Sequence, residues 1–163
     1  MIHESRLTHA LRALLHTQRV AALGTLDDNG APQVSMVPYA MEPCGACLVV
    51  HVSGLAAHTR NLQQTPTVSL LVMQPEVAGE PVHALPRVTL EGQAEVLAAG
   101  SSKWQACRTA YLARFPEAEP MTQLGDFMFV AIRVAGARQI AGFGAARSVD
   151  AHELNHVLKL APG

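Results

Sequence analysis

The sequence predicts a mostly β fold: an antiparallel, Greek-key-like β-barrel with peripheral helices. Apolar, partly β-branched segments alternate with turn residues along most of the chain, and tight turns join the early ones, which favours antiparallel pairing. Several such segments without an internal repeat are typical of a barrel. With 163 residues the chain is long enough to bury a core, and we expect a single domain over residues 1–163.

The predicted strands are bounded by turn residues and cover Val20–Leu26, Ala31–Met41, Cys47–Ser53, Thr67–Met73, Arg87–Leu97 and Phe127–Val134. Asn29-Gly30 lies between the first two strands and is among the strongest short signals for a hairpin. Gly92 interrupts a strand of clean apolar–polar alternation, which indicates a bulge or a close backbone approach. Residues 74–86 contain three prolines and predict a loop.

The predicted helices cover residues 5–17, 55–64, 101–115 and about 150–159. Leucines at helical spacing mark the first helix, and the second stops before Pro66. Asp150 opens the last helix and forms a capping-box-like pair with Glu153. Val149 and Leu154 fit the hydrophobic staple that accompanies such a start.

Composition indicates that part of the surface is covered. Apolar residues make up 49% of the chain and charged residues 15%, which is low for a monomer that must present polar groups to water. Ala31–Met41 is apolar on both faces, although apolar and polar side chains should alternate along a barrel strand that has one solvent-exposed face. We therefore expect a homodimer, in which a second copy covers the outer face, and an apolar pocket for a small molecule.

Charge and patterning exclude several classes of protein. The formal net charge of −1 provides no basic footprint for nucleic acid. No apolar run approaches the roughly 18 residues of a membrane-spanning helix, and the first residues lack the pattern of a signal peptide. Three cysteines (Cys44, Cys47 and Cys107) are too few for a disulfide scaffold. We expect a cytoplasmic protein that binds neither nucleic acid nor membrane.

Five segments carry a family pattern. Residues 24–39 (GTLDDNGAPQVSMVPY) form an opening hairpin, and residues 53–62 (SGLAAHTRNL) begin a helix that leads to a strand at 65–71. EGQAE at 91–95 and AGFGAAR at 141–147 follow. In this order the segments resemble the pyridoxamine-phosphate-oxidase-like family of FMN-binding split barrels, and the last one resembles the haem-utilisation (HugZ-like) subgroup.

The resemblance implies a homodimer with FMN sites at the subunit interface. The residues that it places around the ring, the ribityl chain or the phosphate are Val34, Ser35, Met36, Val37, His51, Val52, Ser53, His58, Thr59, Arg60, Arg87 and Arg147. Many flavin-binding relatives carry Lys or Arg where this chain has Ala57 and His58. Pyridoxamine-phosphate oxidases proper have a further C-terminal segment with substrate contacts, so we do not expect this substrate here.

Physical chemistry agrees with a phosphate site at residues 53–60. A helix start offers unpaired N–H groups and the positive end of the helix dipole. Side chains of Ser53, His58, Thr59 and Arg60 add hydroxyl, imidazole and guanidinium donors within a few residues. The alternative interpretation is that His58 and Arg60 belong to a solvated helix face.

Three further motifs have competing interpretations. His152 and His156 stand in an H-E-x-x-H pattern, but they lie opposite the apolar stripe of a short helix without a third zinc ligand, so we expect no metal site. Cys44 and Cys47 spell C-x-x-C in a hairpin turn, whereas redox pairs begin a helix after a strand, so they are interpreted as ordinary turn cysteines. Arg147 either reaches a cofactor across the dimer or pairs with Asp150.

The main functional hypothesis is a flavin-dependent oxidoreductase, in which FMN supplies the redox chemistry and the protein positions it beside a small substrate. The first alternative, on the same dimeric scaffold, is a haem-binding or haem-degrading protein with His152 or His156 as candidate axial ligands. The second alternative is a flavin-binding module without turnover.

Overall fold

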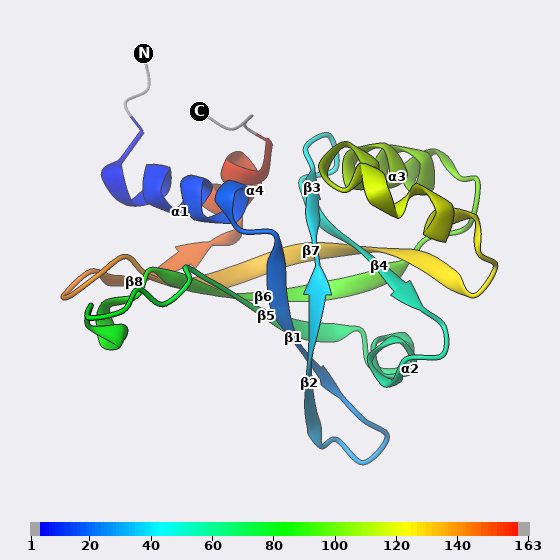
Figure 1. Ribbon diagram of the computed structural model, residues 1–163, viewed down its shortest axis with the longest axis horizontal. Helices are drawn as coiled ribbons and strands as arrows, with labels where there is room; N and C mark the ends of the chain where they lie inside the picture. The colour runs from blue at the N-terminus through cyan, green and yellow to red at the C-terminus, as the bar shows by residue number, and fades with distance from the viewer. Residues whose placement is uncertain (1–3, 160–163) are drawn as a thin grey trace.

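The structure is a computed structural model that describes residues 4–159, in which one eight-stranded antiparallel sheet curls into a barrel flanked by helices (Figure 1). The strands are β1 (Val20–Leu26), β2 (Pro32–Pro38), β3 (Ala40–Glu42), β4 (Cys47–Ser53), β5 (Thr67–Met73), β6 (Arg87–Val96), β7 (Phe127–Ile140) and β8 (Ala146–Asp150). The helical segments are α1 (Arg6–Thr17), α2 (Ala57–Gln64), η1 (Val82–Ala84), α3 (Ser102–Arg114), η2 (Pro116–Gln123) and α4 (Ala151–Lys159). The predicted mostly β, antiparallel fold is confirmed.

The order of the strands explains why the sheet curls. Neighbours along the sheet run β2-β1-β5-β6-β7-β4-β3, and β8 pairs with β7 beside this path. β2 and β3 lie at opposite ends of the path, yet only Tyr39 separates them in the chain. Because one residue spans only about 3.5 Å, the two ends of the sheet must meet, and the barrel closes at this point.

Tyr39 is fully buried at this junction. Its hydroxyl donates to the carbonyl of Leu15 at 2.7 Å, and its backbone N–H donates to the carbonyl of Arg19 at 3.1 Å. The Arg114 guanidinium lies 5.0 Å from the centre of the Tyr39 ring. Burial raises the pKa of Tyr39 to about 12, so the hydroxyl remains a donor. The junction therefore ties the barrel to both α1 and α3.

Two apolar clusters hold the fold together. The barrel interior packs against leucines of α1 and α4, including Leu11, Leu15, Leu154 and Leu158. A second cluster lies on the outer face of β4 and β7, where α3 covers it. Figure 1 shows α1 and α4 together at one end of the molecule, with α3 above β4 and α2 on the opposite side. Among the described helices, none is long and apolar enough to cross a membrane.

Three element predictions need correction. The single strand Ala31–Met41 is wrong, because the chain bends at Tyr39 to pass from one end of the sheet to the other. Phe127–Val134 continues to Ile140, since the exposed Arg133 and Ala135 interrupt the apolar run without ending the strand. The predictions contained no β8, whose short sequence ARSVD alternates only weakly, with Val149 as its buried residue.

Two predictions that depend on only a few consecutive residues agree with the structure. At the Asn29-Gly30 turn, Gly30 takes φ 74°, and the Asp27 carboxylate accepts from the N–H groups of Asn29 and Ala31. At Gly92 the pairing of β6 with β7 shifts register between Glu91 and Gly92. The predicted hairpin and the predicted bulge are both confirmed.

Gly92 also marks a close approach of two strands. A Cβ atom at this position would lie 2.8 Å from both the Arg133 carbonyl oxygen and Ile132 Cγ2. We expect Gly92→Ala to lower the free energy of unfolding by about 1–3 kcal/mol, because the backbone of β7 cannot move aside freely. Urea unfolding followed by circular dichroism measures this, with Gly125→Ala as the control because a Cβ at Gly125 meets no atom within 4 Å. Equal effects of the two substitutions would contradict the prediction.

Candidate functional site

The turn before α2 is ordered by its own hydrogen bonds. The Thr59 hydroxyl donates to the Ser53 carbonyl at 2.6 Å, and Ser53 Oγ accepts from the Leu55 N–H at 3.1 Å. Ala56 is the N-cap and provides no side-chain cap, and the first turn of α2 contains no acidic residue. The start of α2 therefore presents N–H groups without a side-chain acceptor at the positive end of the helix dipole.

Positive charge at the start of α2 comes from one side chain. Arg60 is exposed. Thr59 is fully buried, and its hydroxyl already donates to the Ser53 carbonyl. His58 is half-buried, and this burial lowers its pKa below the ordinary value, which favours the neutral imidazole at pH 7. An anion at this helix start would therefore find backbone N–H groups and the single guanidinium of Arg60.

The sequence reasoning missed Asn61, which positions α2. Its side-chain amide is buried and donates to Thr25 Oγ1 at 3.1 Å and to Gln33 Oε1 at 2.7 Å. These contacts fix α2 against the hairpin of β1 and β2. The available signal was a polar residue directly beside Leu62, which packs into the barrel core.

The four predicted contacts on β2 are divided between two faces. Val34 is 73% exposed and Met36 63% exposed, whereas Val37 packs into the barrel core. Ser35 shares the face of Val37, because side chains alternate along a strand. Ser35 Oγ is buried and has no hydrogen-bond partner within residues 4–159. An unpartnered buried hydroxyl next to exposed apolar side chains is consistent with a site that binds a flat, partly polar ligand.

His51 and Val52 also point to opposite sides of their strand. Val52 belongs to the barrel core, whereas the His51 ring lies 4.4 Å from the Phe129 ring, 5.1 Å from Phe127 and 5.8 Å from Tyr111, centre to centre. Burial lowers the pKa of His51 to about 4, so its imidazole is neutral at pH 7. Its Nδ1 is buried without a hydrogen-bond partner in the described part of the chain.

Two predicted arginines have structural partners. The guanidinium of Arg87 donates to the carbonyls of His83 and Leu85, at 3.3 and 2.9 Å, and thereby holds the loop before β6. Arg147 donates twice to the Glu153 carboxylate, at 2.7 and 2.8 Å, and this lowers the pKa of Glu153. The Arg147–Asp150 alternative is wrong: Asp150 instead caps α4 by accepting from the Glu153 N–H at 2.9 Å.

The last helix has the predicted faces. Leu154, Val157 and Leu158 are buried, and His152 and His156 are exposed on the other side. Within residues 4–159 no group of three or more His, Cys, Asp or Glu side chains is arranged to hold a metal ion. The two histidines are one turn apart, so their imidazoles face solvent together and are accessible to a large ligand.

These residues fit the two candidate cofactors differently. For FMN, the structure offers the start of α2, the exposed side chains of Val34 and Met36, and the unpartnered Ser35 hydroxyl. The phosphate of FMN would rely on Arg60 as its charged partner. For haem, the structure offers exposed imidazoles on α4, because iron binds a neutral imidazole nitrogen.

Comparison with known proteins identifies the class. The family described as pyridoxamine 5'-phosphate oxidase matches residues 7–141, and the chain belongs to this family. Its fold is the split barrel of that family. A solved haem-binding protein from Mycobacterium smegmatis superposes with a TM-score of 0.82 at 29% identity, covering 96% of this chain and 62% of its own.

Named relatives point to haem. The haem oxygenase HutZ of Vibrio cholerae is 27% identical over 161 residues, which are 98% of this chain and 90% of HutZ. The chloroplastic haem oxygenase HOZ of Arabidopsis thaliana is 34% identical over 140 residues, which are 83% of this chain and 40% of HOZ. The chain thus spans less than two thirds of the mycobacterial and Arabidopsis proteins. The predicted resemblance to the family and to its haem-utilisation subgroup is confirmed.

The buried imidazole of His51 predicts a pH dependence of stability. An unfolded histidine takes up its proton near pH 6.5, but folded His51 does so only near pH 4. Between these values the unfolded state binds more protons, so stability falls as the pH is lowered from about 6.5 to 4. The expected loss is roughly 3 kcal/mol in the free energy of unfolding.

His51→Gln removes the titrating group and should flatten this part of the profile. Urea unfolding at a series of pH values between 7 and 4 measures the slope for both proteins. His9→Gln is the control, because the side chain of His9 is 64% exposed on α1. If the wild type and His51→Gln lose stability in parallel over this range, the protonation of His51 is not the cause.

Proposed function

We propose that this protein binds haem and takes part in its degradation. The observation that carries the proposal is the alignment with HutZ, a haem oxygenase, along nearly the whole of both chains. Membership of the family and the similarity to the mycobacterial haem-binding protein also support the proposal that this protein binds haem. Haem, when bound, supplies the iron at which the oxygen chemistry of haem degradation takes place.

The end of the molecule around α4 provides groups suited to haem. His152 and His156 are the exposed imidazoles that can ligate iron. Lys159 on the same helix is an exposed cation suited to a propionate group. Phe143, between β7 and β8, is 76% exposed and offers an apolar ring. The glycines on either side of it, Gly142 and Gly144, take φ values of 129° and 73° that hold this turn.

A haemin titration of the purified protein tests this function. We expect a shifted, saturable Soret band, and a weaker or displaced band in His152→Ala or His156→Ala. The matched control is His83→Ala, which removes an exposed imidazole far along the chain in η1 and should leave the band unchanged. A wild-type spectrum identical to that of free haemin would reject the proposal.

FMN is the second candidate, in a flavin-dependent oxidoreductase or in a flavin-binding module without turnover. Two observations favour it: the uncapped start of α2 and the unpartnered Ser35 hydroxyl. In the same titration format, FMN binding should quench flavin fluorescence, and Arg60→Ala should weaken it because this removes the charged phosphate partner. If the fluorescence of FMN does not change at any protein concentration, this candidate is eliminated.

The cytoplasmic location stays a prediction.

We also propose that the protein is a homodimer that covers β2. Val34 and Met36 are large apolar side chains on an edge strand, and exposed apolar surface of this kind marks an interface. In this arrangement a second copy would complete the ligand site along β2.

Light scattering after gel filtration tests this interface. We expect the wild type to be dimeric and Met36→Glu to shift towards the monomer, because a buried, unpaired carboxylate opposes association. Met121→Glu is the control, since Met121 is 43% exposed on η2, away from β2. A monomeric wild type at micromolar concentration would refute the homodimer.

A further inference from the structure

A closed ring of hydrogen bonds joins α1, β7, β8 and α4 at one end of the molecule (Figure 1). Arg147 of β8 donates through Nη1 and Nη2 to the two carboxylate oxygens of Glu153 on α4, at 2.8 and 2.7 Å. Its Nε donates to Gln139 Oε1 of β7 at 2.8 Å, and Gln139 Nε2 donates to the carbonyl of Leu7 on α1 at 3.0 Å. The Thr8 hydroxyl closes the ring by donating to Glu153 Oε1 at 2.5 Å.

The direction of each bond in the ring is fixed. Gln139 is 2% exposed, and a buried amide is costly unless both its donor and its acceptor are bound. Arg147 uses all three guanidinium nitrogens, and this planar group fixes the plane of the carboxylate that it binds. The bond from Arg147 holds the pKa of Glu153 below its ordinary value, so the carboxylate is ionised and only accepts. Thr8 must therefore donate to it, and the Ser5 hydroxyl donates to Thr8 in turn at 2.7 Å.

Glu153 lies at the boundary between two faces of α4. Because a helix turns by about 100° per residue, Leu154 and Val157 lie on one side of Glu153, and His152 and His156 lie on the other. The two apolar side chains are fully buried, and the two imidazoles are exposed. Apolar contacts are non-directional, whereas hydrogen bonds are directional. The ring therefore sets the rotation of α4 about its axis, and with it the direction of both imidazoles.

We propose that Arg147 and Glu153 are positioning residues for haem, which turn α4 so that His152 or His156 can ligate the iron. The inference rests on the proposed haem function, and it assigns neither Arg147 nor Glu153 a contact with haem. Groups that orient a metal-binding imidazole affect the affinity of the site even though they do not touch the metal. Arg147 ends the segment that resembles the haem-utilisation subgroup, and in this proposal it acts through Glu153.

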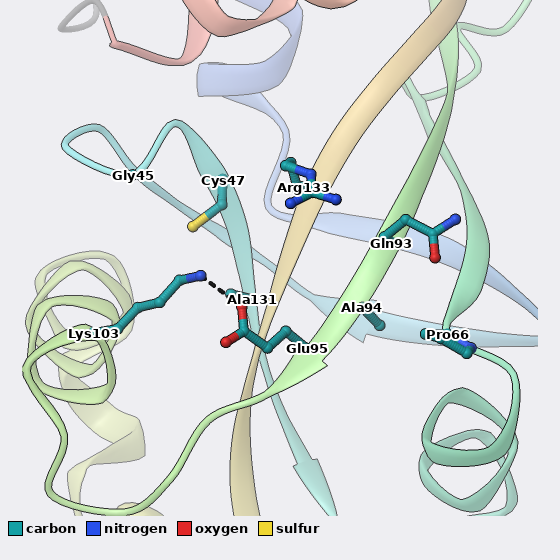
Figure 2. A pocket seen from close by; sticks show the side chains of 9 residues that line it. All are labelled: Gly45, Cys47, Pro66, Gln93, Ala94, Glu95, Lys103, Ala131 and Arg133. Atoms are coloured by element: carbon teal, nitrogen blue, oxygen red, sulfur yellow. Dashed lines mark hydrogen bonds and ion pairs between the residues drawn. The ribbon is translucent and has the colours of Figure 1, made fainter.

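The ion pair of Lys103 and Glu95 provides a comparison on other elements. Figure 2 shows this pair beside a hollow of about 230 Å³ that is lined mainly by residues of β6 and β7. Lys103 Nζ lies 2.6 Å from Glu95 Oε2, but the two side chains are 50% and 60% exposed, whereas those of Arg147 and Glu153 are both 24% exposed. Exposed pairs of this kind contribute little to stability. Lys103→Ala is therefore a control for the loss of an ion pair away from α4.

Haemin titration of variants of the ring tests the proposal. Arg147→Lys keeps the positive charge but loses the planar fork, and Thr8→Val removes one bond to Glu153 from a distant part of the chain. We expect Arg147→Lys to bind haemin about tenfold more weakly than the wild type, and Thr8→Val to bind it more weakly by a smaller factor. In both variants the Soret maximum at saturating haemin should shift, because the imidazole is turned. Lys103→Ala should match the wild type in affinity and in the Soret maximum.

Val157→Ala separates positioning from stability. This substitution leaves a cavity beneath α4 and keeps the ring, so it should lower the melting temperature without moving the Soret maximum at saturating haemin. Amide hydrogen exchange of the haem-free protein provides an independent measurement. Arg147→Lys should speed exchange within residues 151–159 and leave residues 102–114 of α3 unchanged, because only α4 depends on the ring.

The outcomes distinguish this inference from the haem function itself. If the Soret maximum at saturation is the same in Arg147→Lys, Thr8→Val and the wild type, the positioning role is rejected and the haem function stands. If Val157→Ala moves the maximum as far as Arg147→Lys does, the effect is one of stability, and the positioning role is rejected as well. A wild type that produces no Soret shift with haemin rejects the haem function and this inference together.

Discussion

The closure of the barrel at Tyr39 is the constraint on which the rest of the structure depends. A single residue connects the two ends of the sheet path, so the sheet can exist only in its curled form. Tyr39 maintains the junction through its bond to Leu15, its backbone bond to Arg19 and the guanidinium of Arg114 over its ring. Closure leaves the outer side of β2 without a neighbour, and this exposed face is where a ligand or second subunit can bind.

β4 links the barrel to everything outside it. Its inward residues, such as Val50 and Val52, fill the interior, and its outward residues pack beneath α3. The ring of His51 lies on this outward side, where it packs against Tyr111 of α3. A single strand thus contributes both to the barrel core and to the site of a neutral buried imidazole, because side chains alternate between the two faces of a strand.

Features set by neighbouring residues could be predicted from the sequence, and those set by distant residues could not. The Asn29-Gly30 hairpin, the Gly92 bulge and the Asp150 cap each depend on a few consecutive residues, and all three are present. The Asn61 amide, which bonds to Thr25 and Gln33, joins segments about thirty residues apart. In the same way, Arg147 pairs with Glu153 and not with the nearer Asp150, because the fold brings these two side chains together.

The contact between α1 and α4 has a consequence for folding kinetics. Thr8 of α1 donates to the carboxylate of Glu153, which lies 145 residues further along the chain, and Glu153 is also the partner of Arg147. Because loop-closure entropy must be overcome before such a contact forms, α4 docks late, and the high contact order slows folding. During synthesis the part of α1 that packs against α4 stays uncovered until the ribosome has released α4. The nascent chain is therefore most exposed to aggregation just before α4 emerges.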